Sequence, residues 1–441
     1  MRGLARVNKG QNGCANQGLT YCGSASVTAI SCWAAGGCVA GGHFTDRDQH
    51  VQAFVALERK GRWGNAQEVP GTAKLNTGGD AQVSLVSCAR TSVCVAVGTY
   101  SGGWFTTTER NGRWESATPV PVPPLNKAGV NAVWCAPGGL CVAGGSFTDA
   151  SGATQDWVRT DTRGRWQPGI EVPGLAALNV GGDASIDAVS CASAGNCAAA
   201  GQYASGTNVT SDVLPPLQPF VVTETNGRWG TAQVVPGIEA NTPDLWGDTT
   251  AIACPSAGNC TAAGNYQDGV PESCQGPDDG CSAVFVVNER HNTWRQATLR
   301  LGVGYVLSLT CPATGDCVAG GYAENGADDI YGALISETND GPPRALVMTR
   351  TFWVNSVSCA EPGYCAAGGT YGNGGAFVIS EQHGIWGTPV TPAGLPNPAK
   401  SQGATVGAVG CPPRVALCLA GGNDTPVNSD RAQAFLVAQA R

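Results

Sequence analysis

A motif of two cysteines separated by five residues, Cys-x5-Cys, recurs along this chain and constrains its fold more than any other feature. Seven copies have this spacing, and an eighth copy has six intervening residues. The pairs are Cys32 with Cys38, Cys88 with Cys94, Cys135 with Cys141, Cys191 with Cys197, Cys254 with Cys260, Cys311 with Cys317, Cys359 with Cys365, and Cys411 with Cys418. Successive copies begin 47 to 63 residues apart, which is close to the period of about 40–50 residues found for propeller blades.

The second repeat shows the pattern inside one copy. Runs at 83–87, 94–100 and 104–109 predict three strands, a, b and c, and the Asn-Gly turn at 111–112 predicts a hairpin to a fourth strand, d. Trp recurs at the start of strand d, and an acidic residue recurs before the turn. Because nearly every copy has both, we assign them to packing and turn chemistry rather than catalysis. These residues are Trp63, Trp114, Trp166, Trp229, Trp294 and Trp386, and Glu58, Glu109, Asp161, Glu224, Glu289, Glu337 and Glu381.

The repeats predict a single all-β domain, residues 1–441, folded as an eight-bladed β-propeller of four-stranded antiparallel blades. The content of 63 Gly and 27 Pro, with only 13% charged residues, suits short strands joined by turns. The eighth repeat ends after its strand c at 434–438. We expect residues 3–7 to supply the missing strand d and close the ring, because closure removes exposed sheet edges.

Each cysteine pair is placed to staple its own a–b hairpin, since facing strands bring Cα atoms within disulfide reach. We expect all twenty cysteines to pair, including Cys14 with Cys22 and Cys274 with Cys281. Zinc is disfavoured, because thiolates in separate blades cannot converge on one ion. We expect no cofactor, and nothing in the sequence supports a structural or site-bound Ca²⁺.

This number of paired cysteines indicates an oxidising compartment, so we expect a secreted or cell-surface protein. No apolar segment follows Met1, and we expect that a signal peptide has been removed. The chain has no run of 18 apolar residues, which argues against membrane insertion. The net charge of −8 argues against nucleic acid as a partner.

The pattern Ser-Cys-x5-Cys-x-Ala-x-Gly-x-Tyr, followed by Phe-x3-Glu-x2-Gly-x-Trp, resembles the repeats of secreted β-propeller proteins from high-GC Gram-positive, actinobacterial species. The resemblance covers about residues 26–438. Most of these proteins carry no assigned activity, so the resemblance implies an architecture and no reaction. The blades lack the Trp-Asp signature of WD40 repeats, the kelch glycine pair in its usual place and the Asp-box of sialidases, so the functional residues of those families do not transfer.

We expect the functional site on the face formed by the b–c and d–a loops, because these loops vary while the a–b and c–d turns repeat. We expect it over blades 2 to 5, because this arc contains the two longest b–c loops, those of blades 4 and 5, and the aromatic and acidic residues that depart from the repeat pattern. Recurring aromatics at the end of strand b either stack on sugars or pack beneath the loops. Acids before strand a either bind a ligand or cap their own loop. The candidate ligand-binding residues are His43, Asp80, Tyr100, Trp104, Asp183, Tyr203, Trp246, Asp248 and Tyr266.

The sequence therefore favours an extracellular binding module that recognises carbohydrate, or a cell-surface protein, and acts as a monomer. A polysaccharide lyase or glycoside hydrolase with its site on the same face is an alternative, because propeller enzymes gather carboxylates or Tyr and His from separate blades. A structural, protein-binding scaffold is a third. The sequence contains no Gly-x-Ser-x-Gly or His-Glu-x-x-His motif that would identify catalytic residues.

Overall fold

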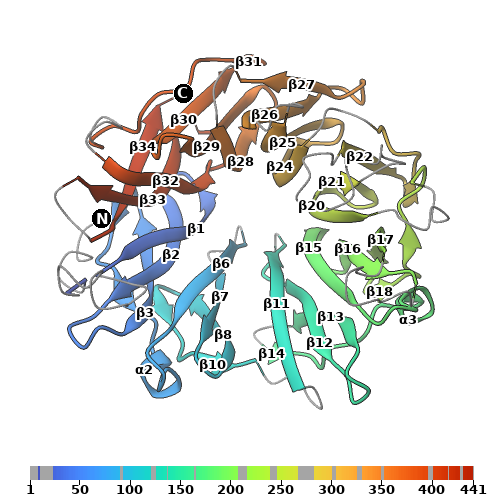
Figure 1. Ribbon diagram of the computed structural model, residues 1–441, viewed down its shortest axis with the longest axis horizontal. Helices are drawn as coiled ribbons and strands as arrows, with labels where there is room; N and C mark the ends of the chain where they lie inside the picture. The colour runs from blue at the N-terminus through green and yellow to red at the C-terminus, as the bar shows by residue number, and fades with distance from the viewer. Residues whose placement is uncertain are drawn as a thin grey trace. The chain divides into compact units, whose positions relative to one another are not determined.

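The chain is an eight-bladed all-β propeller with antiparallel blades, as the repeats predict (Figure 1). The computed structural model describes residues 8–9, 23–89, 93–120, 126–136, 138–162, 165–206, 216–238, 246–266, 283–299, 304–324, 330–348, 352–395, 401–415, 417–427 and 431–440. Blades 1, 2, 7 and 8 belong to one compact unit, Met1–Pro121 with Thr351–Arg441. Blades 3 to 6 form the other, Val122–Arg350.

In the first unit, each blade begins with long strands a, b and c, and in blades 1, 2 and 7 strand d is short or split in two. Blade 1 has β1 (Ala25–Ala34), β2 (Gly37–Thr45), β3 (Val51–Arg59), β4 (Arg62–Trp63) and β5 (Gln67–Glu68); blade 2 has β6 (Gln82–Cys88), β7 (Cys94–Tyr100), β8 (Gly103–Arg110), β9 (Arg113–Trp114) and β10 (Thr118–Pro119). Blade 7 has β28 (Phe352–Glu361), β29 (Tyr364–Tyr371), β30 (Ala376–Gln382) and β31 (Ile385–Trp386); blade 8 has β32 (Ser401–Gly410), β33 (Leu417–Pro426) and β34 (Gln433–Ala440).

The second unit repeats the same strand order in its four blades. Blade 3 has β11 (Asn126–Cys135), β12 (Cys141–Thr148), β13 (Thr154–Thr162) and β14 (Arg165–Trp166); blade 4 has β15 (Ala184–Ser193), β16 (Asn196–Ala204), β17 (Leu217–Thr225), β18 (Arg228–Trp229) and β19 (Gln233–Val234). Blade 5 has β20 (Gly247–Ser256), β21 (Asn259–Tyr266), β22 (Ala283–Arg290) and β23 (Thr293–Trp294); blade 6 has β24 (Gly304–Ala313), β25 (Asp316–Glu324), β26 (Ile330–Glu337) and β27 (Arg344–Val347). One-turn helices α2 (Thr72–Leu75) and α3 (Leu175–Leu178) precede blades 2 and 4. None of the described helices has the length and apolar content needed to cross a bilayer.

Eight disulfides staple the a–b hairpins, which confirms the pairing predicted for the repeats. The bonds join Cys32 to Cys38, Cys88 to Cys94, Cys135 to Cys141, Cys191 to Cys197, Cys254 to Cys260, Cys311 to Cys317, Cys359 to Cys365, and Cys411 to Cys418. In blade 1 the two cysteines face each other directly across β1 and β2, and their Cα atoms are 4.0 Å apart. The remaining cysteines, Cys14, Cys22, Cys274 and Cys281, lie outside the described residues.

The disulfide hairpin also docks on the c–d turn of its own blade. In blade 1 the Gly61 amide donates to the Gly36 carbonyl at 3.0 Å. Gly36 has a positive φ of 62°, and a Cβ there would meet the Gly61 nitrogen at 2.4 Å. The turn therefore needs glycine both for its backbone conformation and for this close approach.

A β-bulge in strand a explains the glycine of the Cys-x-Ala-x-Gly repeat. In blade 4 the register of β15 and β16 shifts between Ile186 and Ala188, which leaves Asp187 as the extra residue. The bulge brings the Ser185 carbonyl so close to strand b that a Cβ on Gly201 would lie 2.0 Å from its oxygen. The same close approach occurs at Gly42, Gly98, Gly145, Gly264, Gly321, Gly369 and Gly422.

The bulged residue also links neighbouring blades within each unit. Its side chain donates a hydrogen bond to the carbonyl of the residue that precedes the bulge in the next blade. This bond runs from Thr28 to Val83, from Asn131 to Ile186, from Thr250 to Val306 and from Asn355 to Val406, at 2.5 to 3.0 Å. Asp187 occupies the same position in blade 4, and it differs because a carboxylate has no hydrogen to donate.

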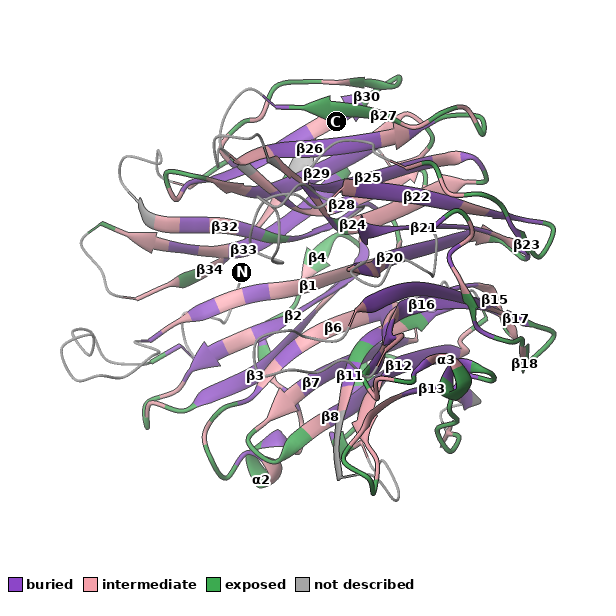
Figure 2. Cartoon of the chain, turned by 45° about the vertical axis from the view of Figure 1, so that its right-hand side comes forward, coloured by how far each residue is buried: buried purple, intermediate pink, exposed green. Residues whose placement is uncertain are grey.

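The cores lie between adjacent blades rather than inside them. Between blades 1 and 2, Val55 and Val39 pack with Phe105 and Trp114, and Trp294 is similarly buried between blades 4 and 5. This confirms the packing role predicted for the repeated tryptophans at these positions. Figure 2 shows buried residues (purple) along the strands, whereas helix α2 is largely exposed (green).

The repeated acids before the c–d turns are buried, and they join successive blades. Thr223 of blade 4 donates to Glu289 of blade 5, and Asn288 of blade 5 donates to Glu337 of blade 6. Burial raises the pKa of Glu224, Glu289 and Glu337 above the usual range of a carboxyl. The acids therefore contribute to packing between blades as well as to turns.

Blade 8 contacts blade 1 inside the first unit. The Ala25 amide donates to the Ala432 carbonyl at 3.0 Å, and β32 and β33 lie beside β1 (Figure 1). Asn8 is buried and links the two blades, since its backbone carbonyl accepts from Arg431 of blade 8 and its Oδ1 accepts from the Thr45 amide of blade 1. Residues 3–7, predicted to complete blade 8, lie outside the described residues; the described part of blade 8 has three strands.

Candidate functional site

One layer of side chains at the loop-side ends of strands a and b differs from blade to blade, whereas the cysteines and glycines nearby repeat. In each blade this layer contains two residues that face each other across strands a and b. The pairs are Ser26 with His43, Gln82 with Thr99, Gly129 with Ser146, Ser185 with Gln202, Asp248 with Asn265, Tyr305 with Tyr322, Trp353 with Thr370, and Thr405 with Asn423. Residues that the fold does not repeat are the best candidates for function.

In blade 5 this layer holds a carboxylate fixed by an amide. Asn265 donates from Nδ2 to Asp248 Oδ1 at 2.9 Å, and its own Oδ1 accepts from the Val306 amide of blade 6 at 2.8 Å. Asn265 therefore ties the acid of blade 5 to the strand that carries Tyr305. Burial raises the pKa of Asp248, although the bond from Asn265 acts in the opposite direction. Its side chain keeps intermediate exposure.

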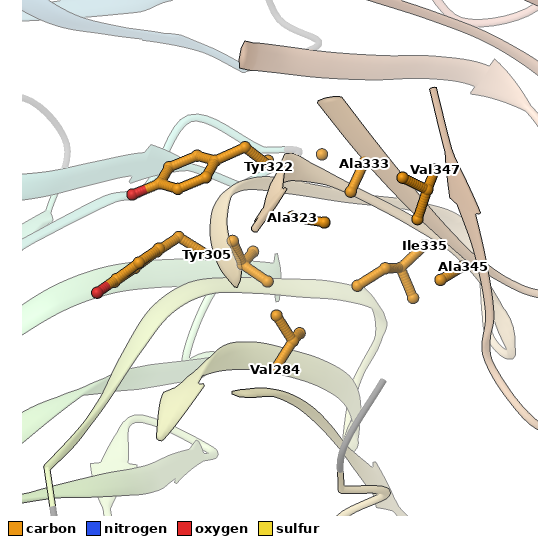
Figure 3. A pocket seen from close by; sticks show the side chains of 11 residues that line it. Val284, Tyr305, Tyr322, Ala323, Ala333, Ile335, Ala345 and Val347 are labelled. Atoms are coloured by element: carbon orange, nitrogen blue, oxygen red, sulfur yellow. The ribbon is translucent and has the colours of Figure 1, made fainter. Parts of the chain in front are cut away.

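In blade 6 the same layer holds two stacked tyrosines. The rings of Tyr305 and Tyr322 have centroids 5.0 Å apart and planes inclined by 31°. Figure 3 shows both hydroxyl groups pointing to the same side, away from an apolar cavity that Val284, Ile335 and Val347 help to line. That cavity, of about 30 Å³, holds little more than a water molecule. The tyrosines therefore form a surface with a packed apolar base.

Asp187 adds a second carboxyl on the neighbouring blade 4. Its Oδ1 accepts from Ser185 Oγ at 2.7 Å and from Asn131 Nδ2 at 3.4 Å. Burial raises its pKa to about 7, and the negative charges of Asp248 and Asp183 add to this shift. Blades 4 to 6 thus carry two carboxyls with raised pKa values and a tyrosine pair. The described residues hold no group of three or more His, Cys, Asp and Glu side chains arranged to bind a metal ion.

The other predicted residues of the second unit lie at different depths. Tyr203 and Tyr266 are 2% exposed and pack on strand-c rings, with centroids 6.4 Å from Phe220 and 6.3 Å from Phe285. They occupy the packing position that the sequence left as an alternative. Trp246 immediately precedes β20 and is half-buried.

Asp183 is exposed at the end of a loop that the preceding blade holds in place. Asn179 accepts from the Asp183 amide at 2.8 Å and donates to the Thr154 carbonyl of blade 3 at 3.0 Å. An equivalent asparagine, Asn76, accepts from the Asp80 amide at 2.8 Å in the first unit. In both loops the asparagine, rather than the aspartate, caps the Gly-Gly-Asp segment.

In the first unit the structure brings His43 close to Asp80. Burial lowers the pKa of His43, the carboxylate of Asp80 partly offsets that effect, and the buried Nδ1 of His43 has no hydrogen-bond partner among the described residues. Tyr100 and Trp104 are half-buried at the two ends of the β7–β8 turn, where Trp104 faces Thr99. These residues form a second, smaller group on blades 1 and 2.

Sequence reasoning did not select Asp187 and Tyr305. By analogy with strand a of the second repeat, Asp187 lies inside a predicted strand, where an alternating pattern assigns side chains to packing or solvent, and Tyr305 directly precedes one. The signal was present in the repeat alignment, because Asp187 replaces the Thr or Asn found in blades 1, 3, 5 and 7. Tyr305 likewise occupies a position where blades 1, 2 and 4 have Ser or Gln.

No protein-family model matches the sequence, and no curated protein matches it. Solved structures of similar fold include an ulvan lyase of polysaccharide lyase family PL25, with 8% identity, a TM-score of 0.49 and 95% of each chain covered. The propeller domain of Cps50 (Swd1) from Myceliophteria thermophila has 12% identity and a TM-score of 0.46, over 80% of this chain and 96% of that chain. The GH93 α-L-arabinofuranosidase of Fusarium graminearum has 11% identity and a TM-score of 0.38, over 64% and 86%. At these identities the similarity concerns the fold alone.

Proposed function

We propose that this protein is an extracellular carbohydrate-binding module whose site lies on the loop-side layer of blades 4 to 6. The observation that carries the proposal is the Asp248–Asn265 pair, hydrogen-bonded to the strand that bears the stacked Tyr305 and Tyr322. A carboxylate and an amide bind sugar hydroxyls, and aromatic rings pack against the apolar face of a pyranose. Eight disulfides support a site of action in an oxidising, extracellular compartment.

The parts of this site are held in place before any ligand arrives. Asp248 is fixed by Asn265, and Asn265 is fixed by the backbone of blade 6. A side chain that is already ordered loses little entropy on binding, which favours affinity. This rigidity suits a recognition surface built on strands.

A glycan array followed by calorimetric titration of the strongest hit tests the proposal. Asp248→Asn removes a charge-assisted acceptor and should weaken binding by roughly tenfold or more. Tyr305→Ala should weaken it by about fivefold, from the lost aromatic contact, whereas Tyr305→Phe should retain most of the affinity.

Two variants serve as matched controls. Asp48→Asn removes the same charge from an exposed loop of blade 1, and Trp353→Ala removes a ring from the equivalent layer position in blade 7. Neither should change the affinity by more than about twofold. Equal losses in controls and site variants, or no array hit at all, would rule out this site.

A polysaccharide lyase or hydrolase is the second candidate, and one observation favours it. A carboxyl with a pKa of about 7, as at Asp187, can hold a proton at neutral pH and donate it to a leaving group. Incubation with array hits, followed by assays for new reducing ends and unsaturated products, separates the two functions. Product formation that is lost in Asp187→Asn would assign catalysis to this layer.

A further inference from the structure

A groove between the outer strands of blades 1 and 2 is lined by cationic side chains, although the protein carries a net negative charge. The chain has a net charge of −8, yet Arg59 and Arg62 line this groove of about 350 Å³ together with Asn65, Gln67, Leu57 and Trp114. Its volume falls in the range of small-ligand sites, roughly 300–1,000 Å³. The polar side chains of the lining are cations and amides, and none of the described lining residues is acidic.

Arg59 is held in position by a buried acid of the next blade. Its Nη2 lies 3.0 Å from Glu109 Oε1, whose side chain is fully buried, while the Arg59 side chain remains 46% exposed. The guanidinium lies over Gly112, where a Cβ would be only 3.2 Å from Cζ. Arg62 is exposed, and it forms no ion pair within the described part of the chain. One cation of the groove is therefore preorganised and the other is available.

Trp114 supplies an observation that is independent of charge. It is 8% exposed, and its buried Nε1 has no hydrogen-bond partner among the described residues. Its counterpart in blade 5, Trp294, donates from Nε1 to Thr223 Oγ1 of blade 4 at 3.1 Å. In blade 1 the position of Thr223 is taken by Leu57, which also lines the groove and whose side chain carries no acceptor. A buried N–H without a partner is costly, and an acceptor brought by a ligand would satisfy it.

We propose that this groove binds an acidic saccharide through the carboxylate of a uronic acid unit. A planar carboxylate matches the paired N–H groups of arginine, and amides such as Asn65 and Gln67 bind hydroxyls. The lining also contains the apolar side chains of Leu57 and Trp114. An inorganic anion would gain nothing from these side chains, whereas the C–H face of a sugar ring packs against them. This groove lies on different blades from the carbohydrate site proposed on blades 4 to 6, and it does not depend on that site.

The test is calorimetric titration of the full-length protein with a short oligogalacturonate at low salt. Arg62→Gln should weaken binding about tenfold, and Lys60→Gln, which removes an equal charge from the same turn but outside the groove, should change it by less than about twofold. Binding should also fall as salt is raised. The methyl-esterified oligosaccharide, which lacks the charge, should not bind detectably.

A second variant addresses the indole group. Leu57→Thr places a hydroxyl where Thr223 lies in blade 4, so it should give the Trp114 N–H an internal partner and weaken oligogalacturonate binding several-fold. Thermal unfolding of each variant shows whether the fold is kept.

Three results would overturn the proposal. Equal effects of Arg62→Gln and Lys60→Gln would exclude the groove. Inorganic phosphate that competes fully at the same concentration would show a simple anion site, and a polyglutamate peptide that binds while the saccharide does not would assign the groove to protein. Asp248→Asn should leave this binding unchanged, which separates the outcome from that of the site on blades 4 to 6.

Discussion

Replacing Asp187 with asparagine should stabilise the protein at alkaline pH. In four other blades the bulged residue of strand a donates to a carbonyl of the next blade, as Asn131 does to Ile186 at 3.0 Å. Ionised Asp187 has no hydrogen to donate to the Thr249 carbonyl, which is the equivalent acceptor in blade 5. The side-chain amide introduced by Asp187→Asn would supply the missing donor and remove a poorly solvated charge.

Two contributions set the size of the effect. The pKa of Asp187 rises from 3.8 to about 7, and each pKa unit corresponds to about 1.4 kcal/mol, which gives an upper limit of about 4 kcal/mol. Because the side chain keeps intermediate exposure, we reduce this by about half. One added hydrogen bond contributes about 1 kcal/mol. We therefore expect Asp187→Asn to gain about 2–3 kcal/mol at pH 8.

The pH dependence gives this prediction a clear sign. The folded pKa of Asp187 lies above the unfolded value, so the native state binds the extra proton between the two. The stability that this proton provides is complete below pH 3.8 and is lost as the pH rises through about 7. The advantage of Asp187→Asn should therefore be largest at pH 8 and nearly absent at pH 4, where protonated Asp187 can donate the same bond.

Thermal unfolding at pH 4, 5 and 8 measures this. With roughly 2.1 cal/mol/K of unfolding entropy per residue, one cooperative transition of 441 residues should shift by about 2–3 °C at pH 8. Asp183→Asn, which removes a neighbouring exposed charge, should shift it by less than about 1 °C. A destabilised Asp187→Asn protein, or a gain of equal size at all three pH values, would refute the reasoning.

Three further substitutions in the second unit test the blade architecture by chemical denaturation. Gly201→Ala, whose Cβ would lie 2.0 Å from the Ser185 carbonyl oxygen, should lose about 3 kcal/mol; a neutral effect would mean that the bulge relaxes freely. Trp294→Ala should lose about 3–5 kcal/mol from a core between blades, and a loss below about 1 kcal/mol would argue against that packing role. Replacing Cys191 and Cys197 together with Ser should lose about 2–3 kcal/mol of unfolding free energy. An unchanged stability would mean that the hairpin is equally constrained without its disulfide.

The sequence predicted the blade framework well because local signals determine it. Facing cysteines mark each a–b hairpin, and Asn111, assigned to a c–d turn, has the positive φ value of a tight turn. The Trp of strand d is assigned to packing between blades, and Trp114 and Trp294 are buried there. These features depend on residues close together in the chain, where spacing alone carries the information.

Contacts between blades were not predictable in the same way. Sequence reasoning assigns Glu289 to packing or turn chemistry, but its partner Thr223 lies 66 residues away. The bulge at Asp187 is invisible in an alternating strand pattern, because one extra residue changes which side chains face the next blade. The glycine of Cys-x-Ala-x-Gly recurs in the sequence, yet its reason, the close carbonyl of strand a, appears only in three dimensions.

For the candidate site, too, the sequence identified individual residues better than it predicted their contacts and depth of burial. His43 and Asp80, selected separately, lie close enough to influence each other. Tyr203 and Tyr266, chosen as candidate ligand-binding residues, are buried on neighbouring rings, whereas Tyr305 was not chosen. Exposure depends on how far the strand ends extend beyond the packed core, and spacing does not encode that depth.

Hydrogen exchange with and without the strongest glycan-array ligand tests the central claim most directly. We expect slower exchange in the loop-side ends of β20, β24 and β25, at residues 246–250, 304–308 and 320–323. The disulfide hairpins on the opposite face should remain unchanged. Protection confined to those hairpins, or absent from all three segments at saturating ligand, would contradict the assignment of carbohydrate recognition to blades 4 to 6.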